Sequence, residues 1–292
     1  MRFSRCGQTA ETAETAETAE TAETAETAET AETAETAATA ASGKTLKTRL
    51  LAGVFVRFAL VLALALALVS VLFSARAALA SDGFVPTNQY VVQNVEGWTV
   101  LVNKHLLTDQ AKLGGRALEL LRQKLNYIRR VVPAQACHQL QGVRIWLGVN
   151  DGHSPCSEYH FSREWLKEHG YNPDKAKSVE IGNAELFTEW SVDQPMMVLH
   201  ELAHAFHDQV LGQDNQGVKD AFDHAQRSRI YESVLDCKGS RRRAYALTNE
   251  KEYFAESSEA YFGRNDFYPF TRVDLQRFDP QMYALLGKIW QQ

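Results

Sequence analysis

His200-Glu201-Leu202-Ala203-His204 is the stretch of this 292-residue chain that decides its fold. Residues at i and i+4 lie on one face of an α-helix, so both imidazoles can reach the same metal ion. Glu201, between them, is placed to take a proton from an attacking water. Because the pattern H-E-x-x-H also arises by chance, its meaning depends on the segments around it.

The motif lies in a segment whose apolar residues recur at helical spacing. We expect a helix that begins near Asp193, has Pro195 in its first turn and ends at Gly212. Its apolar residues are numerous enough to bury more than one side of it. Buried imidazoles and a buried carboxylate need partners, because an unsatisfied buried polar group costs about 1–3 kcal/mol. A metal ion would supply them.

A catalytic zinc ion usually takes three protein ligands, so the two histidines leave one ligand to find. A second helix is predicted over residues 249–262, with Gly263 as its C-terminal stop, and it carries Glu252-x-x-x-Glu256. These two glutamates share one helical face. We predict that Glu252 binds zinc and that Glu256 orients a ligating histidine.

Three nearby residues with possible metal-binding groups are not expected to bind the zinc ion. His207 lies one turn beyond the motif, and a straight helix rarely presents three successive turns to one ion. We therefore expect His207 to be solvent-exposed or hydrogen-bonded. Glu250 and Glu259 are expected to lie on an exposed acidic face of the second helix.

The motif at 200–204 and the block Tyr245-Ala246-Leu247-Thr248-Asn249-Glu250-Lys251-Glu252-Tyr253-Phe254-Ala255-Glu256 resemble the gluzincin zinc metallopeptidases, most closely the anthrax lethal factor-type catalytic domain. The resemblance covers roughly Val179 to Phe270. It implies that Glu252 is the third zinc ligand and that Tyr245, seven residues earlier, points to the metal. It also implies an α+β, zincin-like fold, helix-rich with a small mixed sheet and an active-site helix that carries HExxH.

The function expected from this resemblance is a zinc-dependent endopeptidase that acts on a peptide or protein substrate. Glu201 would be the general base, and Tyr245 would donate a hydrogen bond to the oxyanion, unless it is an ordinary packed tyrosine. Two alternatives stay open, namely a zinc-stabilised binding module without activity and a zinc hydrolase of a non-peptide amide. Retention of Glu201 argues against the first, because a structural zinc site needs no general base.

The first 80 residues stand apart from the fold. Residues 1–43 contain a Glu-Thr-Ala repeat, from Glu11 to Thr36, which has nothing large enough to form a core and is expected to be disordered. Residues 44–80 combine a basic flank with an uncharged run from Phe58 to Ala75 and small-x-small patterns after it, as a signal peptide does. An uncleaved membrane anchor is the alternative. Either interpretation predicts an exported protein, secreted or held in the cell envelope.

Residues 81–292 are long enough for one metallopeptidase domain, which we divide into an N-terminal lobe (81–178) and a zinc-site lobe (179–292). Residues 1–80 hold nine glutamates and seven basic residues, so without them the formal charge moves from -5 to -3. A charge so near balance gives no support for a nucleic-acid partner, and a membrane partner is expected only if the signal segment is not cleaved. The oligomeric state cannot be inferred.

Three cysteines remain in residues 81–292, and in an oxidising compartment one pair of them can form a disulfide. We favour Cys137 with Cys156, because both flank one predicted strand, while pairing with Cys237 and three free thiols stay open.

The remaining elements follow from periodicity and breakers. We expect a hairpin with its turn at Glu96-Gly97, and an edge strand along the active-site cleft at Val179 to Asn183. The other predicted elements are a helix over 106–132, a strand over 143–149, a short helix over 162–169 capped by Ser162, and one or two helices over 274–290.

Overall fold

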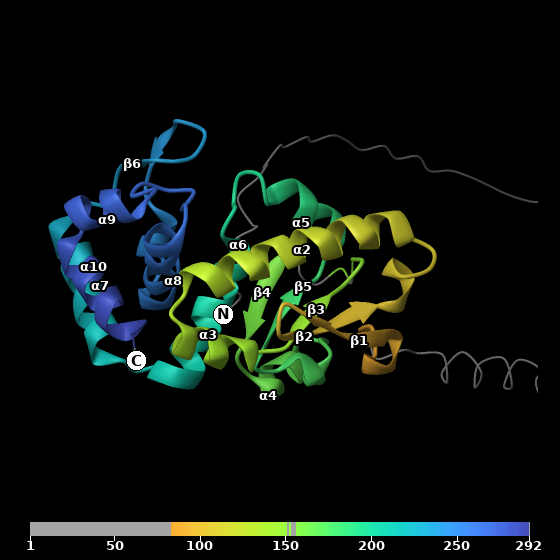
Figure 1. The fold of residues 1–292 in the computed structure, drawn as a ribbon. Helices are drawn as coiled ribbons and strands as arrows, with labels where there is room; N and C mark the ends of the chain where they lie inside the picture. The colour runs from red at the N-terminus through yellow and green to blue at the C-terminus, as the bar shows by residue number, and fades with distance from the viewer. Residues whose placement is uncertain (1–82, 151, 153–155, 292) are drawn as a thin grey trace, which may run out of the picture. The chain divides into compact units, whose positions relative to one another are not determined.

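The computed structural model describes residues 83–150, 152 and 156–291 (Figure 1). The repeat of residues 1–43 and the segment 44–80 lie outside the described residues, so the expectations about them stay predictions. Among the described helices, none combines the length and the apolar character that a bilayer span requires.

A five-stranded mixed sheet lies on one side of the active-site helix, in the order β1-β2-β3-β5-β4. The pairs β1–β2 and β4–β5 are antiparallel, whereas β3 runs parallel to both of its neighbours. This arrangement is the small mixed sheet that the sequence predicts. The strands are β1 (Tyr90–Val95), β2 (Trp98–Asn103), β3 (Ile145–Leu147), β4 (Ser157–His160) and β5 (Ser178–Ile181).

The predicted hairpin forms β1 and β2, with Val95 opposite Trp98 across a two-residue turn. Both turn residues have positive φ, 54° at Glu96 and 99° at Gly97. A turn with two left-handed residues matches the twist of the strands it joins, which is why Gly97 occurs at this position.

The edge strand differs from the expectation. β5 lies between β3 and β4, so the edge beside the active-site helix is β4. The sequence Ser157-Glu158-Tyr159-His160 does not suggest a buried strand, yet all four residues are buried. Of its polar side chains, His160 has a clear partner, because its Nε2 lies 2.7 Å from Glu180 Oε2 on β5, and Lys175 pairs with the same glutamate.

Helix α2 (Ala111–Val131) packs against α5 (Ala184–Trp190) and α6 (Met197–Phe206). It begins five residues after the predicted start, because Leu106 falls in a separate 3₁₀ turn, Lys104–Leu106. Gly114 allows the close approach between this turn and the helix. A Cβ atom at Gly114 would meet the Leu106 carbonyl oxygen at 1.8 Å.

Helix α3 (Ala134–Gln141) follows Pro133, and α4 (Arg163–Glu168) is capped by Ser162, whose Oγ accepts a hydrogen bond from Trp165 N, as predicted. The cysteines do not pair as we favoured. Cys137 on α3, Cys156 and Cys237 are all free thiols, and Cys156 Sγ instead lies 3.2 Å from Met197 Sδ.

The motif helix α6 begins at Met197, later than expected, because Met196 has the non-helical backbone conformation of an N-terminal cap, and the Pro195 carbonyl before it accepts a hydrogen bond from Lys124 Nζ of α2 at 2.9 Å. A π-helical turn, His207–Leu211, continues α6 and ends at Gly212, which has a φ of 82°. All ten residues of α6 are buried. It packs against α8 (Glu250–Phe262), whose bounds agree with the second predicted helix.

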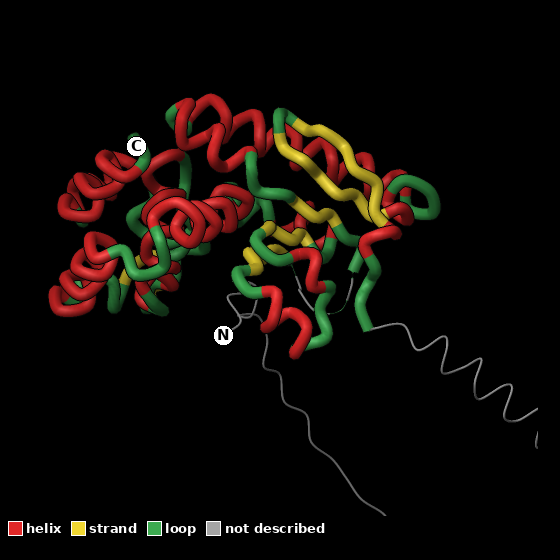
Figure 2. Tube along the Cα trace, turned by 90° about the horizontal axis from the view of Figure 1, so that it is seen from below, coloured by secondary structure: helices red, strands yellow, loops and turns green. Residues whose placement is uncertain are grey.

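The C-terminal helices lie on the opposite side of α6 from the sheet (Figures 1 and 2). Trp290, at the end of the last helix, packs against the central helices α6 and α8. Its ring centroid lies 4.4 Å from that of Phe206 on α6 and 5.8 Å from that of Phe254 on α8. The predicted C-terminal pair is present as α9 and α10. These elements are α7 (Gln216–Ser228), β6 (Val234–Leu235), β7 (Arg241–Arg242), α9 (Arg272–Phe278) and α10 (Pro280–Ile289).

Together the mixed sheet and the surrounding helices give the helix-rich α+β fold that the sequence predicts, with HExxH on a central helix. The described residues fall in one compact unit. The division into lobes at residue 178 stays a prediction.

Candidate metal centre

Helix α6 brings the two histidines of the motif together at its centre. His200 and His204 are 1% and 7% exposed, and their Nε2 atoms lie 3.0 Å apart. Each imidazole therefore presents one nitrogen to the same small volume, as the i, i+4 spacing requires.

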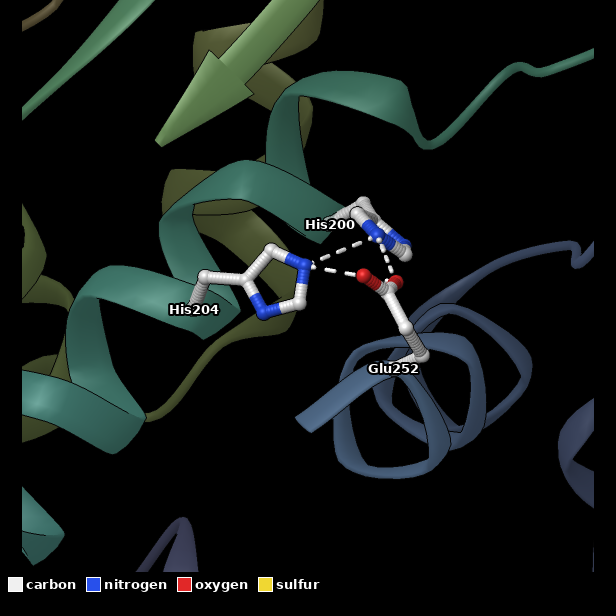
Figure 3. A group of neighbouring side chains, drawn as sticks. All are labelled: His200, His204 and Glu252. Carbon is white, nitrogen blue, oxygen red and sulfur yellow. Dashed lines mark hydrogen bonds and ion pairs between the residues drawn. The ribbon is translucent and has the colours of Figure 1, made fainter. Parts of the chain in front are cut away.

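Glu252 enters this volume from α8 (Figure 3). Its Oε2 lies 3.0 Å from His200 Nε2 and 3.4 Å from His204 Nε2. The N-terminal cap of α8 helps to place it, because Asn249 Oδ1 accepts hydrogen bonds from the backbone N–H groups of Lys251 and Glu252. The Glu252 side chain takes no part in this cap and turns to the histidines instead.

The three facing atoms fit a metal ion. Ligands bound to a tetrahedral zinc ion at 2.0–2.1 Å stand about 3.3 Å from one another, close to the 3.0, 3.0 and 3.4 Å found here. Glu252 Oε1 is buried and has no hydrogen-bond partner among the described residues. A cation would satisfy this oxygen as well as the two opposed imidazole nitrogens.

The pKa shifts of Glu252 and His204 also favour metal binding. Burial alone would raise the pKa of Glu252, but the histidines facing it hold that pKa well below its ordinary value. Burial lowers the pKa of His204, although Glu252 opposes this effect. A deprotonated carboxylate and a neutral imidazole are the forms that bind a metal ion.

The outer nitrogen of His200 is held by a carboxylate other than the predicted one. Its Nδ1 lies 2.7 Å from Glu259 Oε1, whereas Glu256 Oε1 lies 3.7 Å away, beyond hydrogen-bond distance. The exposed position expected for Glu259 is wrong, because its side chain is fully buried. The spacing could have indicated this, since Glu259 is seven residues after Glu252 and therefore shares its helical face.

The structure describes the surroundings of Glu201 and Tyr245. Glu201 lies on α6 between the two histidines and is buried. Tyr245 is half-buried and begins a 3₁₀ turn, Tyr245–Leu247, which packs against α8. The catalytic roles of both residues stay predictions.

The environment expected for His207 is wrong. This residue is 2% exposed, and neither of its ring nitrogens has a hydrogen-bond partner among the described residues. Its ring packs 5.2 Å from that of Phe254. Burial lowers the pKa of His207 to about 4, so the ring is neutral near pH 7. The sequence signal for its burial is the apolar neighbourhood of this residue on the motif helix.

A second buried group, Glu158, His160 and Glu180, lies in the mixed sheet. It holds a cation of its own, because the Lys175 ammonium group pairs with Glu180 and is fully buried with it. We therefore interpret this cluster as a structural ion-pair network that joins β4 to β5.

Residues 152–289 match the family model described as anthrax toxin lethal factor, N- and C-terminal domain. Among solved structures, the Pro-Pro endopeptidase PPEP-2 from Paenibacillus alvei is 20% identical, with a TM-score of 0.37, and the match covers 68% of this chain and 99% of that one. No curated protein sequence matches.

Proposed function

We propose that this protein is an exported zinc-dependent endopeptidase, and the match of residues 152–289 to the family model described as anthrax toxin lethal factor supports this proposal. The observation that carries the proposal is the convergence of His200 Nε2, His204 Nε2 and Glu252 Oε2 within 3.4 Å of one another in a buried site. These three atoms would hold the zinc ion. When bound, zinc supplies Lewis acidity, which polarises a carbonyl group and lowers the pKa of a coordinated water.

His200 is held in the form that zinc binding needs. Its Nδ1–H donates to Glu259, which leaves the lone pair of Nε2 directed at the shared volume. This tautomer is inferred from the hydrogen-bond partner. Glu259 is therefore a positioning residue for the metal site.

Glu201 is the proposed general base. It lies on the same helix as both histidines, next to the first of them, and its side chain is buried, which supports this role. In the proposed reaction it takes a proton from the attacking water and later returns that proton to the leaving amine.

Tyr245 is the proposed oxyanion donor. Its phenol would donate a hydrogen bond to the oxygen of the tetrahedral species, a contact worth about 2.7–4 kcal/mol where comparable donors have been removed. Its place seven residues before Glu252, in a turn that packs against α8, supports this role.

Export rests on the sequence of residues 44–80, with its basic flank and its uncharged run. Amino-terminal sequencing of protein recovered outside the cytoplasm tests it. Cleavage as a signal peptide predicts a chain that begins at Ala78 or Ser81, and an intact membrane-bound chain would favour an anchor.

The Glu201→Gln variant tests the proposed activity. We expect it to keep the zinc content of the native full chain and to lose peptide cleavage by several orders of magnitude, because the ligands are intact and the base is gone. Cleavage of a peptide library, followed by mass spectrometry, is the measurement. Zinc binding with no cleaved peptide in the native chain would instead favour a non-peptide amide substrate or a binding module.

A further inference from the structure

A pocket of about 490 Å³ opens where α2 meets the start of α6 and the end of α8, and none of the proposed metal ligands lines it. This volume is in the range of pockets that bind ligands. Two hydrogen bonds fix α2 to the other walls, because Lys124 Nζ donates to Pro195 O at 2.9 Å and Tyr127 Oη donates to Phe262 O at 2.8 Å. The pocket is therefore a built part of the fold.

The charged side chains that line this pocket are all cationic. Lys124 and Arg130 come from α2, and Arg264 follows the end of α8. In the part of the chain that the structure describes, none of the three forms an ion pair, and no carboxylate lines the pocket. The adjacent Arg129, in contrast, pairs with Glu96 at 3.0 Å. The pocket therefore presents positive charge that its own lining does not offset.

All three cations are accessible to a ligand. Arg130 and Arg264 are exposed, and Lys124 is half-buried. Burial lowers the pKa of Lys124, because its ammonium group loses solvation there. An anion beside it would restore part of that stabilisation. The partly exposed apolar surface of the pocket comes from Leu120, Tyr127 and Pro195.

The spacing of the two cations on α2 indicates the shape of the ligand. Lys124 and Arg130 are six residues apart, so they lie about 9 Å apart along the helix axis. An extended peptide of the polyproline II type has three residues per turn and rises about 3.1 Å per residue, so every third side chain lies on the same side, about 9 Å apart. Carboxylates three positions apart in such a peptide match the two cations.

We propose that this pocket binds an extended acidic segment of a partner protein. Asp or Glu side chains three positions apart face Lys124 and Arg130, Arg264 adds a third cation, and an aliphatic side chain between the acidic residues packs on Tyr127. A basic segment would be repelled by the three cations. The inference does not depend on the proposed function, because it involves none of the residues of the metal centre.

The test is titration calorimetry of the full chain with the blocked peptide Ala-Glu-Leu-Ala-Glu-Ala and with its glutamine analogue, which keeps the shape of the side chains and removes their charge. The Glu201→Gln chain is used throughout, so that the probe is not cleaved. We expect the glutamate peptide to bind about tenfold more tightly than the analogue, and this ratio to fall in high salt.

Arg130→Gln and Arg264→Gln are the informative variants, because both side chains are exposed and their loss should not affect folding. Each should weaken binding of the glutamate peptide by about two- to fivefold, the effect of one exposed ion pair, and leave the analogue unaffected. Arg129→Gln is the matched control, because Arg129 does not line the pocket, and it should change neither affinity.

Equal binding of the two peptides, or a preference for glutamate that survives when Arg130→Gln and Arg264→Gln are combined, would overturn the inference. The chain's own repeat also has a glutamate at every third position, from Glu11 to Glu35, but only Thr and Ala between them. A probe that binds only after these glutamates are exchanged for glutamine would show that the repeat, and not a partner protein, occupies the pocket. A glutamate peptide that binds neither chain would also contradict the proposal.

Discussion

At the scale of single residues, the account depends on which atoms face the two motif histidines. Glu252 contacts both Nε2 atoms, and Glu259 holds the Nδ1 atom of His200. A carboxylate that accepts from a ligating histidine fixes its tautomer and strengthens the ligand. The assignment of this role to Glu259 rather than Glu256 gives a direct comparison.

We predict that Glu259→Gln weakens zinc binding by about 10–100-fold, the usual effect of losing such a partner. Glu256→Gln is the matched control, because it makes the same chemical change one helical turn away, at a carboxylate 3.7 Å from His200 Nδ1. Competition with a zinc chelator measures both affinities. A larger loss of zinc affinity in Glu256→Gln would show that Glu256, and not Glu259, positions His200.

His207 predicts a pH dependence of stability. Its pKa in the folded state is about 4, below the ordinary 6.5, so the unfolded chain binds more protons between these values. Neutral His207 therefore adds to the free energy of unfolding. This contribution, on the order of 3 kcal/mol, is fully present above about pH 6.5 and is lost as the pH falls towards 4.

Urea unfolding of the chelator-treated chain at pH 4.5 and pH 7 measures this effect. In His207→Phe the difference in the free energy of unfolding between the two pH values should shrink. If this difference is the same in His207→Phe as in the native chain, other titratable groups cause the pH dependence.

At the scale of elements, the cap of α8 links folding to the metal site. Asn249→Ala removes the side chain that accepts from Lys251 N and Glu252 N. We expect a loss of about 1 kcal/mol in the free energy of unfolding, together with weaker zinc binding, because Glu252 lies in the first turn.

Asn215→Ala is the control for this prediction, because Asn215 caps α7 through the N–H of Val218 and holds no proposed ligand. Thermal unfolding and zinc titration of both variants separate the two effects. Equal zinc affinities in the two variants would show that the cap does not position Glu252.

The elements also show how far the sequence could lead. Helix α8 and the hairpin were predictable, because Asn249 with Gly263 and the Glu96-Gly97 turn are local signals. Strand β4 was not, because the burial of His160 depends on its contact with Glu180, twenty residues later, which itself pairs with Lys175. The π turn was also missed, since the apolar period continues through it.

The candidate site also has a part that the sequence predicts and a part that depends on packing. His200, His204 and Glu252 come together as spacing and resemblance led us to expect. The contact of Glu259 with His200 depends on how α8 lies along α6, and the environment of His207 depends on the π turn and on Phe254. Neither packing relation is encoded in a short motif.

At the scale of the whole molecule, the two central helices carry an unusual concentration of buried charge. Glu201 of α6 and the three glutamates of α8, at positions 252, 256 and 259, are each no more than 1% exposed. Buried carboxylates are costly unless they are paired or coordinate a metal ion. A divalent cation between the histidines and Glu252 would offset part of this charge, and the described sheet and helices would form the rigid frame around it.

The zinc content of the purified full chain, measured beside Glu252→Ala and Glu250→Ala, tests the central claim most directly. Glu250 is two residues away and does not belong to the ligand group. The account predicts about one zinc ion per chain in the native protein and in Glu250→Ala, and a large loss in Glu252→Ala. Equal zinc contents in all three proteins, or none in the native chain, would contradict it.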